Sequence, residues 1–466
     1  MTKRSAVSFV FLFSFLLAIL LTGQHKIETL AVDQVSSLTQ VSGVVKDDNG
    51  FPIVSRLRVL TMEGESVNSF YSDLHGHFEA ELEKGNYIVE ITKGYEYERV
   101  TLKVEVKDNL MIDLKTVTLA KKYDWEMRGY ISGDLHQHSF YSKDGKNSVN
   151  DVFLANVGSG LRFGVLSDHN STKGLKEWLE TSSYDLSNGN NFIPIGGVEL
   201  SSKKGHFQAI DVLEYAKVDH VTDEETLKAY LESISLLTPC LQVNHPLIKG
   251  KLGFTTWDAI SFFQTIEIWN GHALPPIHDY DGVPQRYTYN VASKKKWFEL
   301  LNQGLKVAAT GSSDNHNIQG SYHLKEESEN PITSQWANNG LYTGQPSTFV
   351  KVNQMDKDSI VTSLNKGASF ITNGPLLDVT IGGSSFGDTI SFNNESDMNY
   401  VVASNTSNLK ELRVIADGVV VQCIQLESPD YVEGTLKLNV ASYHWLVFEV
   451  ITNDLGYAIS NPIYIK

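Results

Sequence analysis

The fold and the chemistry expected of this chain depend on the stretch Gly133-Asp134-Leu135-His136-Gln137-His138-Ser139. A hydrophobic approach at residues 130–131 predicts a strand that ends in His-x-His. Side chains alternate along a strand, so His136 and His138 would share one face and converge on one transition-metal ion. Asp144 lies six residues later, where a loop would bring it back toward the same point. An isolated His-x-His is also common on surfaces, so its meaning depends on the residues downstream of it.

The composition of the 466-residue chain is that of an ordinary globular protein, and its length predicts about three domains. Hydrophobic residues make up 41% and charged residues 20%, so a sizeable core is expected. The net charge of -16 would repel polyphosphate over most of the surface, and no nucleic-acid partner is expected. Bound cations would neutralise part of this charge, and the solubility of a secreted protein explains it equally well.

The N-terminus has the pattern of an export signal. Lys3 and Arg4 precede an uncharged apolar run from Ala6 to Leu21, which is slightly short for a membrane span. Small residues for cleavage lie further on, at Thr29-Leu30-Ala31. We therefore expect residues 1–31 to be a signal peptide or a membrane anchor. The protein would then be exported, and either extracellular or tethered to the outer face of the membrane.

The chain has two cysteines, Cys240 and Cys423, and both lie in apolar segments that look like strands. Thiols in such segments are usually small buried hydrophobic groups. We therefore expect neither a disulfide bond nor a metal site at these two positions.

Alternating β-type segments separated by turn signals predict a β-sandwich over residues 38–122. The motifs at residues 43–52, 72–78 and 85–87 resemble the carboxypeptidase-regulatory-like, transthyretin-type modules of secreted proteins. This resemblance implies a spacing role or a binding role, with a glycan or another protein as the partner. A second His-x-His, formed by His75 and His77, includes a turn glycine, and we expect no chemistry there.

Strands alternate with helical segments from Tyr130 to about Asn373, which predicts a parallel sheet closed, or nearly closed, into a barrel. The strands are expected at residues 161–167, 192–199, 206–212, 240–246, 265–270 and 306–314, and the helices at 149–157, 222–236 and 290–302. Two polar insertions, residues 272–286 and the long stretch after Asn317, would flank the site, the second as a lid. The β-rich residues 376–466 predict another small sandwich.

Histidines and carboxylates recur at the ends of these predicted strands, where barrel enzymes place their sites. They are Asp168-His169, Glu199, His206, Asn244-His245-Pro246 and Asp314-Asn315-His316. Ten of the 14 histidines fall between His136 and His323, in less than half of the chain. Buried histidines need polar partners, so core packing does not explain this bias. The recurrence predicts a metal-binding mouth.

The residues at this mouth resemble those of the polymerase-and-histidinol-phosphatase (PHP) metallohydrolases over about residues 129–375. The closing segment Gly367 to Pro375 is similar to the branch that includes the CehA/McbA-type carbaryl hydrolase relatives. The resemblance implies a multidomain α/β plus β protein, in which a distorted (β/α)7 PHP barrel at residues 128–375 is flanked by the two β-sandwich modules. It also implies two or three divalent metal ions, which would be zinc, manganese or iron.

Carried over residue by residue, the resemblance implies three groups of metal ligands. The groups are His136, His138, Glu199 and Asp314 for the first metal, Glu199, His206 and His245 for the second, and Asp144, His169 and His316 for the third. The shared Glu199 would bridge the first two metals. Many family members have histidine where this chain has Asp144, so the third site departs from the family pattern.

The expected reaction is hydrolysis of an ester bond in a small-molecule or polymer substrate. Metals about 3.5 to 4 Å apart lower the pKa of a bridging water and supply hydroxide, so no separate general base is needed. Asp168 would shuttle a proton or orient a ligand, and Asn270, His272 and Arg286 are candidates for the pocket wall. A phosphoester is the first choice of substrate, and a carbamate or carboxylic ester is the alternative.

Two other interpretations compete with a PHP-type hydrolase. A non-catalytic surface protein would use metals structurally, although a structural site is normally complete with four ligands. The amidohydrolase barrel also begins with His-x-His and ends with an aspartate. It is disfavoured by Asp314-x-His316, and by Glu199 in place of the carbamylated lysine usual there.

Overall fold

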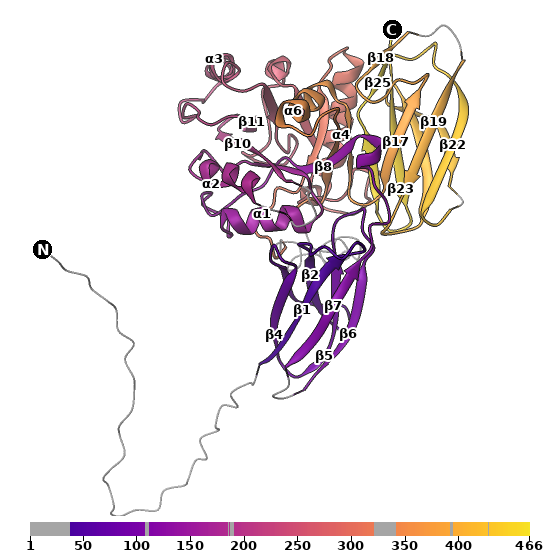
Figure 1. Cartoon of the computed structure of the whole chain (residues 1–466). Helices are drawn as coiled ribbons and strands as arrows, with labels where there is room; N and C mark the ends of the chain where they lie inside the picture. The colour runs from indigo at the N-terminus through magenta and orange to yellow at the C-terminus, as the bar shows by residue number, and fades with distance from the viewer. Residues whose placement is uncertain are drawn as a thin grey trace, which may run out of the picture. The chain divides into compact units, whose positions relative to one another are not determined.

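The computed structural model describes residues 38–107, 111–184, 186, 191–320, 342–391, 395–426 and 428–466 (Figure 1). The expected signal or anchor at residues 1–31, and residues 321–341 of the expected lid, lie outside the described residues. Within the described ranges no helix has both the length and the apolar character needed to cross a membrane. Residues Leu38–Lys466 form one compact unit.

The N-terminal part consists of two small sheets around one hydrophobic core. One sheet has the order β4-β1-β7 and the other β3-β2-β5-β6. The strands are β1 (Thr39–Asp47), β2 (Arg56–Thr61), β3 (Ser66–Tyr71), β4 (His77–Leu82), β5 (Gly85–Thr92), β6 (Val100–Val106) and β7 (Ile112–Leu119). Buried and half-buried residues alternate along β1, because successive side chains point to opposite faces of a strand. Val45, Leu57, Phe78 and Ile91 are among the core residues that both sheets contribute.

The central sheet is strongly curled, and its strands run in the order β14-β13-β12-β11-β10-β9-β8-β15-β16. These strands are β8 (Tyr130–Asp134), β9 (Phe163–Leu166), β10 (Ile193–Ser202), β11 (Gly205–Ile210), β12 (Cys240–Val243), β13 (Thr265–Asn270), β14 (Ala308–Ser312), β15 (Ser347–Lys351) and β16 (Ser369–Thr372). Most were expected within a few residues, because they are short apolar runs that end in polar groups.

This half-barrel sheet is mixed, which corrects the expectation of a parallel one. Strand β11 pairs antiparallel with both β10 and β12, and β15 pairs antiparallel with both β8 and β16. The cause at β11 is local. Lys203 and Lys204 form a two-residue turn, and Gly205 adopts φ +107, so the chain returns along β10 without a helix.

The chain segments just after β8 and β14 meet at the mouth of the curled sheet. The main-chain N–H of His138 donates to the carbonyl of Asn315 at 2.9 Å, and the N–H of Asp314 donates to the carbonyl of His136 at 2.8 Å. The buried Asp134 supports this junction, because its carboxylate accepts from the main-chain N–H groups of Ser313 and Gly344. The two segments that carry most of the predicted first site are therefore tied directly together.

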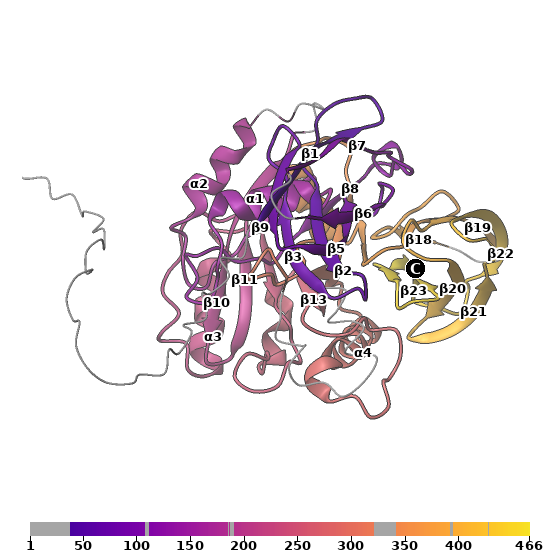
Figure 2. The same ribbon diagram turned by 90° about the horizontal axis from the view of Figure 1, so that it is seen from below.

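Helices lie around the curled sheet (Figure 1 and Figure 2). They are α1 (Val149–Gly158), α2 (Leu175–Glu180), α3 (Glu224–Ile234), α4 (Tyr289–Asn302) and α6 (Lys357–Lys366), with the short 3-10 turns η1 (Glu126–Arg128), η2 (Thr181–Ser183), η3 (Trp257–Phe262) and η4 (Gln285–Tyr287). Helix α1 begins where Ser148 and Asp151 form a reciprocal capping box. Trp178 of α2 and Trp297 of α4 are fully buried against the strands.

The C-terminal part also has two sheets, but one of them continues the central sheet. Strand β16 pairs with β24, so the order runs on through β24-β23-β20-β21, while β17-β19-β22 form a separate sheet. The strands are β17 (Leu376–Ile381), β18 (Thr389–Ile390), β19 (Glu395–Ala403), β20 (Leu409–Ala416), β21 (Val419–Gln425), β22 (Tyr431–Asn439), β23 (Trp445–Thr452), β24 (Tyr457–Ser460) and β25 (Ile463–Ile465). The sequence pattern predicts a small sandwich here, and it does not indicate that one of its sheets continues the central sheet.

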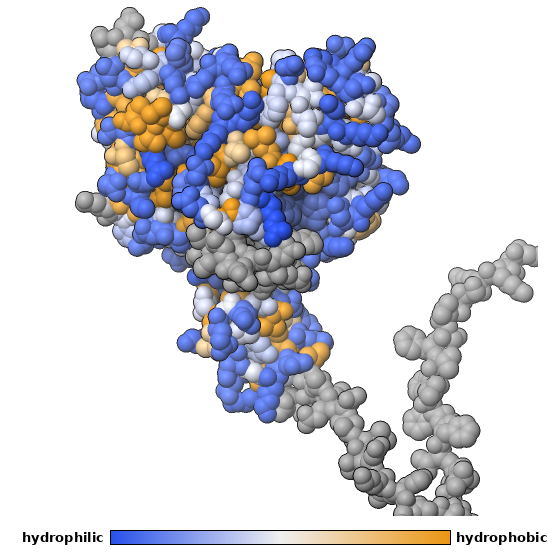
Figure 3. Space-filling model, turned by 180° about the vertical axis from the view of Figure 1, so that it is seen from behind, coloured by the Kyte–Doolittle hydropathy of each residue, from blue (hydrophilic) through white to orange (hydrophobic). Residues whose placement is uncertain are grey.

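Cys240 is buried, as expected, whereas Cys423 is exposed, which corrects the prediction of two buried thiols. Cys423 lies on β21, the last strand of the sheet order, and Val419 and Val420 of the same strand are also exposed. Five of the seven side chains of β21 are exposed, so neither face of this edge strand is fully covered. On the face of the molecule seen in Figure 3, hydrophilic residues predominate, and hydrophobic residues form separate patches.

Candidate metal centre

His136 and His138 lie just beyond the end of β8, and both rings are buried. Their Nε2 atoms face the same two carboxylates, as alternation along the chain predicts. Each Nε2 lies 3.2 Å from Oδ1 of Asp314, and the distances to Oε2 of Glu199 are 3.3 and 3.4 Å. Both imidazoles predicted for the first metal therefore contact both of its predicted carboxylates.

Glu199 lies at the centre of the mouth and is fully buried. Its Oε1 is 3.0 Å from Nδ1 of His206 and 3.1 Å from Nε2 of His245. Its Oε2 faces the other side, where the imidazoles of His136, His138 and His169 lie within 3.4 Å. Although these rings are close, Oε2 accepts no hydrogen bond from any residue that the structure describes.

Two of the candidate ligands are held in left-handed backbone conformations. His245 has φ +26 and Asp314 has φ +53, which are uncommon values for residues other than glycine. Such strain persists only where the surroundings impose it, and it concentrates at functional sites. Here it turns both side chains toward the mouth just after β12 and β14.

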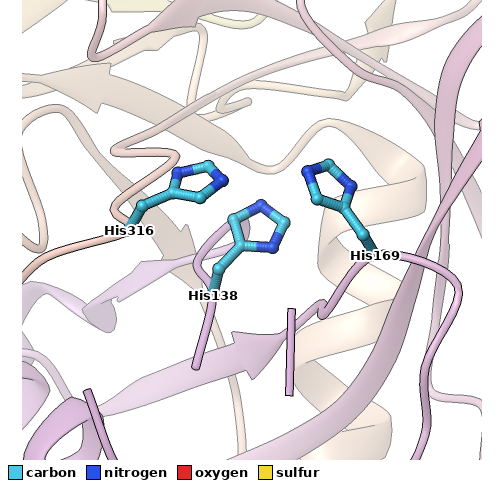
Figure 4. Close-up of side chains that lie close together, drawn as sticks. All are labelled: His138, His169 and His316. Carbon is cyan, nitrogen blue, oxygen red and sulfur yellow. The ribbon is translucent and has the colours of Figure 1, made fainter. Parts of the chain in front are cut away.

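The three residues predicted for the third metal also lie together. Oδ2 of Asp144 is 3.7 Å from Nε2 of His169 and 3.5 Å from Nε2 of His316. Asp144 is at the rim, where 59% of its side chain is exposed. Figure 4 shows that His169 and His316 approach His138 from different segments, and the rings of His138 and His316 are stacked with centroids 4.0 Å apart.

Glu267 is a site residue that we did not predict. It is fully buried on β13, and its Oε1 lies 3.2 Å from Nδ1 of His136. Its Oε2 accepts hydrogen bonds from the main chain of His245 and from Nδ2 of Asn270. The signal in the sequence was a lone acidic residue inside the apolar run Thr265–Asn270, because a buried charge needs partners.

Asp168 lies behind the imidazoles rather than in the mouth. Its carboxylate accepts from the main-chain N–H and the hydroxyl of Ser139, both at 2.7 Å, and from the hydroxyl of Ser142 at 3.0 Å. Ser142 Oγ in turn lies 2.9 Å from Nδ1 of His138. Of the two roles predicted for Asp168, this arrangement favours the orientation of a ligand.

A cavity of about 500 Å³ opens onto the mouth, and it is large enough for a small-molecule substrate. His272 and Arg286, the sequence candidates for the pocket wall, are among the residues that line it, and Lys146 adds a second cation. Asn270 does not line the cavity. It is fully buried behind Asp314, and its Nδ2 donates to Glu267 and Asp314, so its polar groups are already used.

Charges in the mouth shift the pKa values of its groups in different directions. Burial lowers the pKa of His136, but Asp314 and the other nearby carboxylates raise it well above its usual value. Burial, together with the adjacent His316, holds the pKa of His138 well below its usual value. Burial opposes ionisation of Glu199, yet His136 and other imidazoles hold its pKa well below normal. Glu199 is thus an anion and His138 is neutral, which are the forms that bind metals.

Several groups of these side chains have the donors and the spacing to hold metal ions. Within each group, ligand atoms lie within 4.8 Å of one another: His136-His138-Glu199, His169-Glu199-His206, His136-His245-Asp314, His138-His169-His316 and His272-Asp314-His316. The donor set fits divalent metals that accept both imidazole and carboxylate. The last group brings in His272, which the sequence placed only in the pocket wall.

No protein-family model and no curated protein matches this chain. Among solved structures it is similar to a two-domain protein from Bacteroides vulgatus that contains a predicted PHP-like metal-dependent phosphoesterase. That match has 14% identity and a TM-score of 0.39, and covers 72% of this chain and 94% of the other. An amidohydrolase from Chromobacterium violaceum, with bound sulfate and no metal, matches at 14% identity and a TM-score of 0.24, over 40% of this chain and 87% of the other. Likenesses this distant do not decide a function, which we therefore derive from the site.

Proposed function

We propose that this protein is a metal-dependent hydrolase with a multinuclear centre, and that it cleaves phosphoester bonds. The observation that carries the proposal is the position of the buried Glu199. One oxygen of its carboxylate faces His206 and His245, and the other faces His136, His138 and His169. A carboxylate with imidazoles around both oxygens is the donor arrangement expected for a ligand shared between two metal ions.

The proposed metal ligands are those that the PHP resemblance implies. They are His136, His138, Glu199 and Asp314 for one ion, Glu199, His206 and His245 for a second, and Asp144, His169 and His316 for a third. Bound divalent cations would lower the pKa of water and stabilise negative charge on the oxygen atoms of the ester.

The other residues of the chain hold this arrangement in place. Glu267 lies against Nδ1 of His136, which leaves Nε2 of that ring facing the mouth. Asp168 holds Ser142, whose hydroxyl lies against Nδ1 of His138. Contacts of this kind set the tautomer and the orientation of metal-binding imidazoles.

The cavity lining favours a phosphoester over a neutral ester. Lys146 and Arg286 line the cavity, and their positive charges would attract a phosphate group. Ile248, Leu252 and Tyr289 line it as well. These apolar side chains would pack against the organic part of the substrate, and they keep an aryl carbamate or carboxylic ester as the second candidate.

We also propose that the protein is exported and works outside the cell or tethered to the outer face of the membrane. This rests on the N-terminal sequence pattern alone. The β-sandwich modules would then contact a glycan or a protein near the substrate. Fractionation of cells that express the full chain, with and without residues 1–31, tests the location.

The enzymatic proposal is tested with metal-loaded protein and a panel of aryl phosphate, phosphodiester and carbamate substrates. We expect turnover of a phosphoester, with loss of at least about 100-fold in His138→Ala, because a ligand is removed. Glu214→Gln is the matched control, since Glu214 is exposed and outside the cavity lining. The proposal fails if no substrate is turned over, or if His138→Ala equals the wild type.

A further inference from the structure

Two loops beside the cavity carry four lysines, which we call the basic rim. Lys203 and Lys204 form the turn between β10 and β11, and Lys249 and Lys251 lie in the loop just after β12. The side chains of Lys203, Lys249 and Lys251 are exposed, and that of Lys204 is half-buried.

Main-chain hydrogen bonds join the two loops. The N–H of Thr255 donates to the carbonyl of Lys204 at 3.1 Å, and the N–H of His206 donates to the carbonyl of Leu252 at 3.0 Å. Gly205 allows this contact, because a Cβ there would lie 2.4 Å from the carbonyl oxygen of Gly253. The four lysines therefore belong to one surface feature, although about 45 residues separate the two pairs in sequence.

The same loops form one side of the cavity. His206 comes directly after the first loop, His245 begins the second, and both line the cavity together with Ile248 and Leu252. Lys249 and Lys251 are the chain neighbours of Ile248 and Leu252. A substrate whose ester reached the histidines would thus have the basic rim beside its outer part.

The charge of the basic rim contrasts with that of the chain. Residues 200–206 and 245–256 contain four lysines and no acidic residue, in a protein of net charge -16. None of the four forms an ion pair with any residue that the structure describes. The pKa of Asp223 is lowered mainly by hydrogen bonds from Thr226. The charge of Lys204 contributes less to this shift than they do, so Asp223 is not an ion-pair partner of Lys204. A local positive field at a site in an acidic protein concentrates anions there.

We infer that the basic rim binds an anionic group of the substrate other than the scissile phosphate. The substrate class is therefore a phosphoester with at least one further phosphate group. This inference rests on the proposed function for the scissile bond. Lys146 and Arg286, which line the cavity, would meet the scissile phosphate, and the basic rim would meet the second phosphate.

The test compares butyl phosphate with butane-1,4-diyl bisphosphate, which differ only in the second phosphate. With metal-loaded full chain at low salt, we expect the KM of the bisphosphate to be lower by about tenfold. Salt should raise the KM of the bisphosphate more than that of butyl phosphate. Glutamine substitution of Lys203, Lys204, Lys249 and Lys251 should remove most of this difference.

The matched control replaces four other exposed lysines, Lys103, Lys176, Lys217 and Lys410, by glutamine, which changes the net charge equally. The control should keep the preference for the bisphosphate. Equal KM values for the two substrates in the wild type, or equal behaviour of the two variants, would overturn the inference. Calorimetric binding of both compounds separates the two proposals. If the bisphosphate binds more tightly than butyl phosphate but neither compound is hydrolysed, the role of the basic rim is supported and the hydrolase proposal is rejected.

Discussion

Oε1 of Glu267 lies 3.2 Å from Nδ1 of His136, and both side chains are fully buried. This contact leaves Nε2 as the ring atom of His136 that faces Glu199 and Asp314. The carboxylate of Glu267 also holds the main chain of His245. One acidic residue on β13 thus positions candidate ligands that come from two other strand ends.

The Glu267→Gln variant should bind metal about 10 to 100 times more weakly than the wild type. The amide fills the same space but carries no charge, so the contact that orients Nδ1 of the His136 ring becomes weaker. Chelator competition and subsequent elemental analysis measure the change. Glu214→Gln should retain the wild-type affinity, and an unchanged affinity in Glu267→Gln would show that the contact is dispensable.

Asp168→Asn should lower kcat by about 10- to 100-fold without moving either limb of the pH-rate profile. Asparagine cannot accept hydrogen bonds on both of its terminal atoms, so Ser139 loses one acceptor in either orientation of the amide, and Ser142 loses its acceptor in one of them. Steady-state kinetics between about pH 5 and 9 give both quantities. If one limb disappeared in the variant, Asp168 would be a proton-transfer group instead.

Metal-free protein should lose stability as the pH rises above about 6.5, the usual value for histidine. Burial lowers the pKa values of His136, His169 and His245, but neighbouring carboxylates outweigh it and raise them. The folded state therefore binds more protons than the unfolded state in this range. The stabilisation from these three histidines is fully present below their pKa in the unfolded chain. It is lost as the pH rises through their higher pKa values in the folded protein.

Thermal unfolding of chelator-treated protein at several pH values above 6.5 measures this effect. Metal-loaded protein is the control, because metal ions replace the protons and should remove the decline. His138 and His272, whose pKa values are lowered, contribute little at more than about one pH unit above 6.5, since they are then neutral in both states. If the melting temperatures of the metal-free and metal-loaded protein changed in parallel above pH 6.5, the pairing of these imidazoles with Glu199 and Asp314 would be contradicted.

Lys93 should give the protein the opposite pH dependence in a higher range. Its Nζ is buried and donates to the carbonyls of Val54 and Val157, and burial lowers its pKa to about 7. The unfolded chain then binds the proton more tightly, so this contribution to stability rises from about pH 7 toward 10.5.

The measurement is urea unfolding at pH 7 and pH 9. The free energy of unfolding of the wild type, relative to that of Lys93→Met, should be higher at pH 9 than at pH 7. Lys103→Met is the control, because Lys103 is exposed and its difference from the wild type should not depend on pH. The same difference at both pH values for Lys93→Met would show that Lys93 stays charged in the fold.

The sequence showed most of the candidate site because the chemistry repeats along the chain. Each apolar strand leads into histidine or a carboxylate, and the carboxyl ends of neighbouring parallel strands meet at one edge. The predicted partners were therefore found in contact, Asp314 with His136 and Asp144 with His316 among them. Glu267 was missed because it lies in the middle of the run Thr265–Asn270, away from the strand ends and the motifs on which the prediction rested.

The sequence by itself determined which residues are available for metal chemistry and on which short strands they lie, since both depend on local composition and periodicity. Only the tertiary structure decided strand direction and sheet continuity. The return of β11 along β10, and the pairing of β16 with β24, depend on hydrogen bonds between segments that local pattern does not relate. The two-sided environment of Glu199 is the clearest case. Its partners come from four separate chain segments, and only folding brings them around one carboxylate.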